Sequence, residues 1–312
     1  MNNAPTTEDR IWAVISHLSS LAFGMGILLP IIGWSDQRRK SNYASFQCLQ
    51  ALGYQSLGCT IWILSTLVVI ILTSVLLVAV PGFTGEGSNN VDVIRAPWMI
   101  VFFIVVFGIF ALYFLLPVIA AIACVLGRDF RYPIMGDRLA RYLEYNPALR
   151  VEEHTWLIED REFRWVAGMG HFSILIMLWG MLAPLTACIL YGKRSTFLRF
   201  QSIQTLVFQA GVTILYLGAG SMFLFGFLLL VVVTGLIGEP NLNSSMGMTG
   251  IVILGGSLLI SFVIVLLIPL LHILGQWAGY RVLKGDDYRY PWIGRIVDKW
   301  ISKNSAIEEK PA

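Results

Sequence analysis

Charged residues are scarce in this chain of 312 residues, and carboxylates are nearly absent from its long apolar runs. Asp, Glu, Lys and Arg together make up 13% of the sequence, less than a soluble fold of this length needs for its surface. Transporters coupled to protons or ions normally carry their coupling carboxylates inside the membrane. The shortage of buried carboxylates therefore argues against that class of protein.

Cysteine and the common catalytic motifs are also missing or rare. The chain has four cysteines, Cys48, Cys59, Cys124 and Cys188, and no two of them form a C-x-x-C pair. This pattern supports neither a disulfide framework nor a zinc site. No Walker loop, H-E-x-x-H motif, Rossmann fingerprint or Ser/His/Asp arrangement is present. We therefore expect a protein without enzymatic activity, cofactor or bound metal.

Apolar residues make up 56% of the chain, and they come in long runs. The mean hydropathy is +0.72. The runs cover residues 11–34, about 50–80, 98–126, 165–191, about 203–237 and 250–280. Each is long enough to cross a hydrocarbon core of about 30 Å as a helix. The sequence predicts an all-α integral membrane protein with six hydrophobic helical segments, expected in a bacterial cytoplasmic membrane.

The chain contains an internal repeat. The first part of the sequence recurs at a constant offset of 154 residues, the spacing between His17 and His171, without a gap. The residues Arg10, Ala13, His17, Ser19, Pro30, Ser41, Phe46, Gln47, Gln50 and Gln55 fall on Arg164, Ala167, His171, Ser173, Pro184, Ser195, Phe200, Gln201, Gln204 and Gln209. Further on, Arg131-Tyr132-Pro133 returns as Arg289-Tyr290-Pro291. We predict two homologous three-segment repeats, residues 1–150 and 151–312.

The distribution of Lys and Arg leaves two topologies open. If all six segments cross the membrane, the basic residues divide almost evenly between its sides, and the repeats are inverted. If the first segment of each repeat enters and leaves by one face, every basic residue except Arg95 lies on that face. The second distribution is the one that the positive-inside rule expects.

A re-entrant segment must satisfy its backbone polar groups inside the protein, because unpaired N–H and C=O groups in lipid cost several kcal/mol each. Gly24, Gly26 and Pro30 in the first repeat, and Gly180 and Pro184 in the second, are residues at which a helix can break. Gly and Pro are also common in uninterrupted transmembrane helices. Both topologies therefore stay open at this point.

Each repeat ends in a predicted amphipathic helix. In the second, apolar residues recur at helical spacing from Trp292 to Ile301, with Arg295, Asp298 and Lys299 on the other face. Trp292 and Trp300 flanking a basic face are typical of a helix that lies in the headgroup layer. We predict that Trp292, Trp300, Arg295 and Lys299 anchor this helix to the membrane surface. The first repeat has a weaker stripe, with Ile134, Leu139 and Leu143.

Two sets of polar residues are duplicated in the apolar runs. His17 and His171 are equivalent, so a pair of imidazoles could meet and ligate a metal or haem. A hydrogen bond to a neighbouring helix is the simpler interpretation and the one we favour. The second set is a stripe of amides, Gln47, Gln50, Gln55, Gln201, Gln204 and Gln209. These side chains predict interhelical hydrogen bonds or, alternatively, the lining of a polar path.

The ordered motifs resemble a known family. They are R-x-W-A-x-x-x-H (Arg10 to His17), S-F-Q-C-L-Q-A (Ser45 to Ala51) and F-R-Y-P (Phe130 to Pro133), with matching segments in the second repeat. This order is similar to that of the Tic-Twenty-like family, which comprises the chloroplast inner-envelope import protein and small bacterial membrane proteins of unknown function. The resemblance implies a bundle of membrane helices, and for the plastid branch a role in protein translocation. Ser45 and Arg199 depart from the family pattern, which commonly has Asn there.

Two functions from different classes follow. We expect a structural or assembly subunit that packs against other membrane-protein subunits in a larger complex. The alternative is a translocation or channel component whose glutamines line a polar path between the repeats. The expected partners are the lipid bilayer and other membrane proteins, and no nucleic acid.

Overall fold

The computed structural model describes residues 4–84, 91–147, 157–237 and 245–308. Helices, and no strands, are present in these four ranges, which confirms the predicted all-α fold. Six helical segments are long and apolar enough to cross a membrane, and they coincide with the six predicted runs. The predicted boundary between residues 150 and 151 lies outside the described residues.

The first hydrophobic segment of each repeat folds back on itself. In repeat one it consists of α1 (Thr7–Leu18), the 3-10 helix η1 (Ser19–Ile27) and α2 (Leu28–Gln37). The helix breaks at Phe23, where φ is 53°. The two ends of the segment then meet, because Gln37 Nε2 donates to Glu8 Oε1 at 2.9 Å. The segment therefore has the re-entrant geometry that the distribution of basic residues favours.

The second repeat builds the same hairpin from α6 (Glu159–Phe172), η3 (Ser173–Met181) and α7 (Leu182–Tyr191). Its break is at Met177, the residue equivalent to Phe23, and φ is again 53°. A non-glycine residue in this region of φ is strained, so a break conserved between both repeats indicates a built feature of the fold. The sequence offered the glycines and prolines as residues at which the helix can break, and the strained residue lies one position before Gly24 and three before Gly180.

Glycine and proline determine where the hairpin can close. A Cβ atom on Gly26 would lie 1.7 Å from the carbonyl oxygen of Ser19, and one on Gly180 would lie 2.0 Å from that of Ser173. Only glycine permits so close an approach of the two limbs. Pro30 and Pro184 lie in the first turns of α2 and α7, where an N–H group would have no partner within the helix.

Two of the duplicated glutamines satisfy the backbone groups that the break exposes. Gln55 Nε2 donates to the carbonyl oxygen of Ser16 at 3.3 Å and to Ser19 Oγ at 2.9 Å. Gln209 Nε2 donates to the carbonyl oxygen of Gly170 at 2.8 Å and to Ser173 Oγ at 3.3 Å. These bonds meet the requirement for internal partners that a non-spanning segment imposes.

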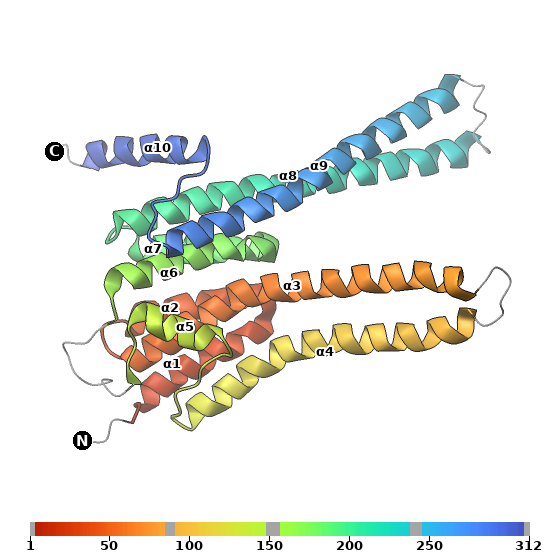
Figure 1. Ribbon diagram of the computed structural model, residues 1–312. Helices are drawn as coiled ribbons and strands as arrows, with labels where there is room; N and C mark the ends of the chain where they lie inside the picture. The colour runs from red at the N-terminus through yellow and green to blue at the C-terminus, as the bar shows by residue number, and fades with distance from the viewer. Residues whose placement is uncertain (1–3, 85–90, 148–156, 238–244, 309–312) are drawn as a thin grey trace.

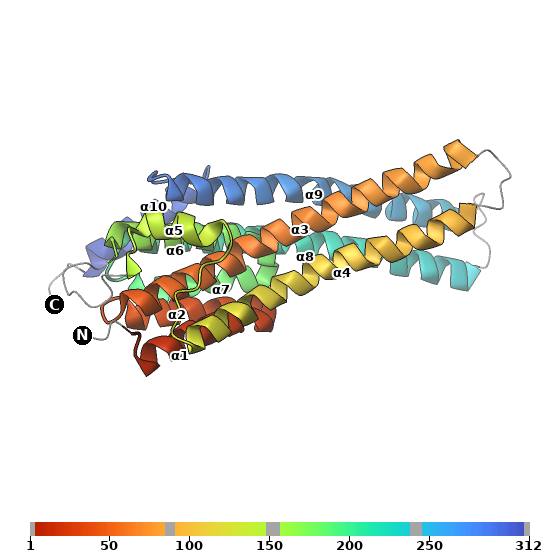
Figure 2. The same ribbon diagram turned by 60° about the horizontal axis from the view of Figure 1, so that its bottom comes forward.

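The remaining hydrophobic segments form two long helical arms. One consists of α3 (Asn42–Thr84) and α4 (Val91–Val125), and the other of α8 (Thr196–Ile237) and α9 (Ser245–Leu283). Figures 1 and 2 show that the hairpins lie beside one half of each arm. The other half, which leads to the connection between the two helices of the arm, extends past the hairpins. Exposed apolar side chains such as Ile104, Leu217 and Leu259 cover the arms, as expected for surfaces that face lipid.

The two amphipathic helices are α5 (Met135–Leu143) and α10 (Ile293–Glu308). In α5, the helix with the weaker stripe, Leu139 and Leu143 are fully buried in the core. In α10, Val297 is buried, whereas Ile296 and Trp300 are exposed next to the exposed Arg295 and Lys299. Trp292 is also exposed, but it lies one residue before the helix, with φ of 62°. Because α5 lies between the repeats and α10 lies on the outside of α8, equivalent helices have different surroundings (Figure 1). The surface anchoring by α10 stays a prediction.

Candidate functional site

A buried polar cluster, which we call the first cluster, holds the hairpin of repeat one against the loop that follows α4. It consists of His17, Gln47, Gln50, Asp129 and Tyr132. Gln47 Nε2 donates to Asp129 Oδ1 and to the carbonyl oxygen of Phe130, both at 3.1 Å. Gln50 Nε2 donates to that same carbonyl at 3.0 Å, and Gln50 Oε1 accepts the backbone N–H of Tyr132 at 2.9 Å. The two amides therefore fix the backbone of the loop on both sides of Arg131.

The hydrogen bonds also define the state of the histidine. His17 Nε2 lies 3.0 Å from Gln47 Oε1, and His17 Nδ1 lies 3.0 Å from Tyr132 Oη. The two bonds that Gln47 Nε2 donates to the loop oxygens fix the orientation of the amide. Gln47 Oε1 then faces the histidine and can only accept, so His17 Nε2 must donate. Nδ1 then accepts the hydroxyl of Tyr132. His17 is thus a neutral imidazole with both ring nitrogens satisfied by protein groups.

The second cluster, His171, Gln201, Gln204, Asp287 and Tyr290, repeats this pattern. His171 Nε2 lies 3.1 Å from Gln201 Oε1, and Nδ1 lies 2.9 Å from Tyr290 Oη. Gln201 Nε2 donates to Asp287 Oδ1 at 2.9 Å and to the carbonyl oxygen of Tyr288 at 3.1 Å. Gln204 Oε1 accepts the backbone N–H of Tyr290 at 3.2 Å. The duplicated residues of the sequence therefore build one structural device twice.

The tyrosine in each cluster is enclosed by aromatic rings. Tyr132 stacks on Tyr54 with ring centroids 4.1 Å apart, and Tyr290 stacks on Phe208 at the same separation. Burial raises the pKa of Tyr132 and of Tyr290 well above the usual value of 10.0, because a buried phenolate is poorly solvated. Both hydroxyls remain neutral donors to their histidines at physiological pH.

This geometry shows what the predicted polar residues do. Gln47, Gln50, Gln201 and Gln204 are completely buried, and their amide groups contact the loops and each other. Gln55 and Gln209 contact the hairpin breaks. His17 and His171 are not brought into a common site, because each is held by the Tyr and Gln of its own repeat. In the described ranges of the chain, no group of three or more His, Cys, Asp or Glu side chains is placed to hold a metal ion.

A buried ion pair that was not predicted from the sequence joins the two repeats. Arg38 Nη2 lies 2.9 Å from Glu162 Oε2, and the two side chains are 5% and 1% exposed. The other carboxylate oxygen of Glu162 accepts the indole N–H of Trp34 at 3.0 Å. The Arg38 guanidinium also lies 4.6 Å from the ring centroid of Phe163. Both oxygens of Glu162 are thus used in a contact between repeats, which we call the joint.

Trp165 extends the joint along α3. Its indole N–H donates to the carbonyl oxygen of Leu49 at 2.9 Å. A Cβ on Gly53 would lie 2.5 Å from Trp165 Cζ2, so a larger residue at position 53 would exclude the indole.

Three residues of the joint differ between the repeats, whereas Glu162 is matched by Glu8. At the offset of 154, Arg38 corresponds to Gly192, Trp165 to Ile11 and Gly53 to Val207. Repeat one therefore supplies Arg38 and Gly53, and repeat two supplies Glu162 and Trp165. The positions at which the copies differ are the signal in the sequence that could have indicated the joint.

Comparison with known proteins changes the family assignment. Residues 8–139 and 162–297 each match the model of the MamF/MmsF family, described as the magnetosome magnetite crystal formation protein family. The double match fits the two predicted repeats. It shows that the resemblance to the Tic-Twenty-like family is wrong, and a role in protein translocation is not supported. No curated protein and no solved structure matches the chain. The apolar helices and the family together establish an integral protein of a bacterial membrane.

Proposed function

Because this chain belongs to the MamF/MmsF family of magnetosome magnetite crystal formation proteins, we propose that it is a non-enzymatic structural or assembly subunit of the magnetosome membrane. The observation that carries the proposal is the joint. Glu162, a carboxylate buried among membrane helices, accepts hydrogen bonds from both Arg38 and Trp34 of the other repeat. The joint holds the two repeats together through these contacts.

The polar residues support a structural role rather than a polar path. A residue that lines an aqueous path has polar atoms that water can reach. Here Gln47, Gln50, Gln201 and Gln204 have no exposed surface, and their amide nitrogens donate to protein oxygens. Their hydrogen bonds support rigid attachment of the two loops to the bundle.

The exterior is suited to assembly in a membrane. Both arms present apolar side chains over their outer surfaces, and Ile296 and Trp300 of α10 are exposed together with Trp292 just before it. Such surfaces can pack against lipid and against other membrane helices. We infer that the two repeats, held together by the joint, position these surfaces for other subunits of the compartment in which the crystal grows.

The proposal is tested in a magnetite-forming bacterium whose own copy of the gene is replaced. We expect deletion to change the number or size of magnetite crystals per cell, measured by electron microscopy. The Arg38→Gln variant should reproduce part of the defect, and Arg39→Gln, which alters an exposed ion pair with Glu159, should not. Crystals that are unchanged after deletion would overturn the proposal.

A second measurement separates a structural subunit from an independent protein. After extraction in a mild detergent, the wild-type chain of 34.8 kDa should migrate in an assembly larger than the monomer. The Arg38→Gln variant should release monomer or unfolded chain. Migration of the folded wild type as a monomer alone would contradict the role in assembly.

A further inference from the structure

An apolar groove runs between the repeats, with a volume of about 710 Å³. Its walls come from α3, α4, α5, Trp165 of α6, and residues at the end of α9. Among its lining residues are Leu57, Ile61, Leu112, Arg138, Tyr142 and Lys284. Ile61 and Leu112 are more than half exposed, so the groove is open along the part of the arms that faces lipid. In a bilayer, such a surface is in contact with the acyl chains of lipids.

The groove is basic where α5 and the end of α9 line it, and we call this part the basic end. Arg138 and Lys284 line it, and no Asp or Glu is among the residues that line it. In the described part of the chain, Arg138 and Lys284 form no ion pair, whereas the neighbouring Arg281 is paired with Asp286. Asp286 also attracts Lys284, but it lies outside the groove lining and is paired with Arg281. Two cations on one apolar groove whose lining has no carboxylate favour an anionic ligand.

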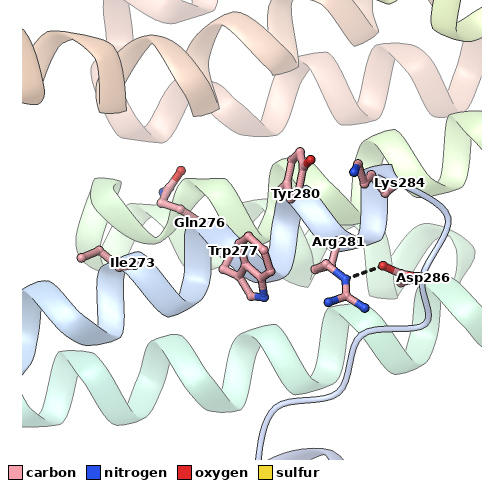
Figure 3. Close-up of a pocket in the computed structure, with 7 residues that line it drawn as sticks. All are labelled: Ile273, Gln276, Trp277, Tyr280, Arg281, Lys284 and Asp286. Atoms are coloured by element: carbon pink, nitrogen blue, oxygen red, sulfur yellow. Dashed lines mark hydrogen bonds and ion pairs between the residues drawn. The ribbon is translucent and has the colours of Figure 1, made fainter.

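The side chains around Lys284 indicate the level of the headgroups. Figure 3 shows Tyr280 and Lys284 along one side of α9, and Trp277 and Arg281 along the adjacent side. The Lys284 ammonium lies 5.1 Å from the ring centroid of Tyr280, and the Arg281 guanidinium lies 5.8 Å from that of Trp277. Trp and Tyr interleaved with Lys and Arg at the end of an apolar helix are typical of the membrane–water interface. The basic end therefore lies where lipid phosphates lie.

The groove also contains donors without acceptors. The hydroxyl of Tyr142 and the indole N–H of Trp62 are buried, line the groove and have no hydrogen-bond partner among the described residues. Buried polar groups in native proteins are nearly always paired. Tyr142 follows Arg138 by one helical turn of α5. A phosphate or ester oxygen at the basic end would therefore supply an acceptor near Arg138 and Tyr142.

From these features we propose that the groove binds one anionic glycerophospholipid, with its phosphate at Arg138 and Lys284 and its acyl chains along Leu57, Ile61 and Leu112. The lipid fills the space between the repeats and adds a contact across it. When Arg131 is aligned with Arg289, Arg138 corresponds to Ile296. The second repeat thus lacks the cation, and the chain has one such site rather than two. The inference does not rest on the proposed function.

The site is tested by measuring which lipids stay bound. Full-length protein in mild detergent is mixed with dioleoyl phosphatidylglycerol or dioleoyl phosphatidylcholine, and retained lipid is counted by native mass spectrometry. We expect one phosphatidylglycerol per chain, retained in preference to phosphatidylcholine. The double variant Arg138→Gln, Lys284→Gln should lower that preference about tenfold, since charge-assisted hydrogen bonds are lost.

A matched control is Lys193→Gln with Arg194→Gln after α7, which also removes two exposed cations but lies outside the groove. It should retain the wild-type preference. Equal retention of the two lipids by the wild type, or an equal loss in the control variant, would overturn the proposal, because binding would then follow net charge alone.

A measurement on the unaltered chain covers the case in which the variants do not fold. Phosphatidylglycerol with a photoreactive diazirine in one acyl chain is bound to the wild type and irradiated, and labelled residues are mapped by mass spectrometry. We expect label at Leu57, Ile61 or Leu112. Label confined to the outer surface, at Ile119 and Ile122, would contradict the site.

Discussion

Arg38 and Glu162 form a buried ion pair across the two repeats, with 2.9 Å between Nη2 and Oε2, at a position where the repeats differ. The residue equivalent to Arg38 is Gly192, so the second repeat has no arginine to continue the contact. Glu8, the equivalent of Glu162, instead bonds Gln37 of its own hairpin. The joint therefore forms once, between unlike surfaces, and does not extend into an open array.

Removal of one partner of the joint should be costly. We expect Arg38→Ala to lower the free energy of unfolding by about 3 to 5 kcal/mol, because Glu162 would remain as a buried, unpaired carboxylate. Arg39→Ala removes an exposed pair with Glu159, whose side chains are 45% and 52% exposed, and should cost at most about 1 kcal/mol. Thermal unfolding in detergent measures both. Equal losses in the two variants would show that the joint does not stabilise the fold.

The hairpin turns should tolerate no side chain. Gly26→Ala and Gly180→Ala should each destabilise the protein by more than about 3 kcal/mol, since the new Cβ would overlap the carbonyl oxygen of Ser19 or Ser173 and the backbone must move. Gly218→Ala on α8 is the matched control, because no atom lies within 4 Å of its added Cβ. Melting temperatures in detergent decide the matter. A mild effect at Gly26 would mean that the two limbs of the hairpin lie further apart.

Re-entrant hairpins place the connections of both repeats on one side of the membrane. We expect single cysteines at Lys40 and Lys193, in a cysteine-free background, to react with an impermeant maleimide from the same side. If the first segment of each repeat crossed the membrane, these positions would lie on opposite sides. Both lysines are exposed in the structure, so a failure to label is informative about sidedness once permeabilised membranes label fully.

Alkaline pH should weaken both polar clusters. The pKa of Tyr132 and of Tyr290 is raised above 10.0 by burial, so the folded state favours the protonated phenol. The stability that this provides is fully present below pH 10, the unfolded value, and is lost as the pH rises toward the folded values. The double variant Tyr132→Phe, Tyr290→Phe should therefore unfold at a lower temperature at pH 8, by the loss of one hydrogen bond of about 1 kcal/mol in each cluster. Its melting temperature should also fall less steeply above pH 10 than that of the wild type.

The pattern of apolar runs and duplicated residues was sufficient to predict the six segments, the two repeats and both amphipathic helices. Helix periodicity and the length of apolar runs are local properties of the sequence, so they predict helices without knowledge of tertiary contacts. The partners of Gln47 and Gln201 could not be predicted, since each lies on a loop more than eighty residues further along the chain. For the same reason, the sequence does not distinguish glutamines that line a polar path from glutamines that bind loops.

The joint was not predicted from the sequence, and the reason is different. Residues that are identical in the two repeats, such as His17 and His171, serve each repeat separately. Residues that bind one repeat to the other, such as Arg38 and Trp165, occupy positions where the copies differ. The family was also misassigned, because short motifs of Gln, Tyr and Pro describe how a loop is attached to a bundle and say little about what the bundle does.

The most direct test of a structural role is the ion permeability of the purified chain reconstituted in liposomes. We expect liposomes with the wild-type protein to release a trapped ion no faster than empty liposomes, because the buried amides of Gln47 and Gln201 are bonded to protein oxygens. A wild-type flux that disappears in the Gln47→Leu, Gln201→Leu variant, with its melting temperature unchanged, would contradict the structural role and assign these glutamines to a conducting path.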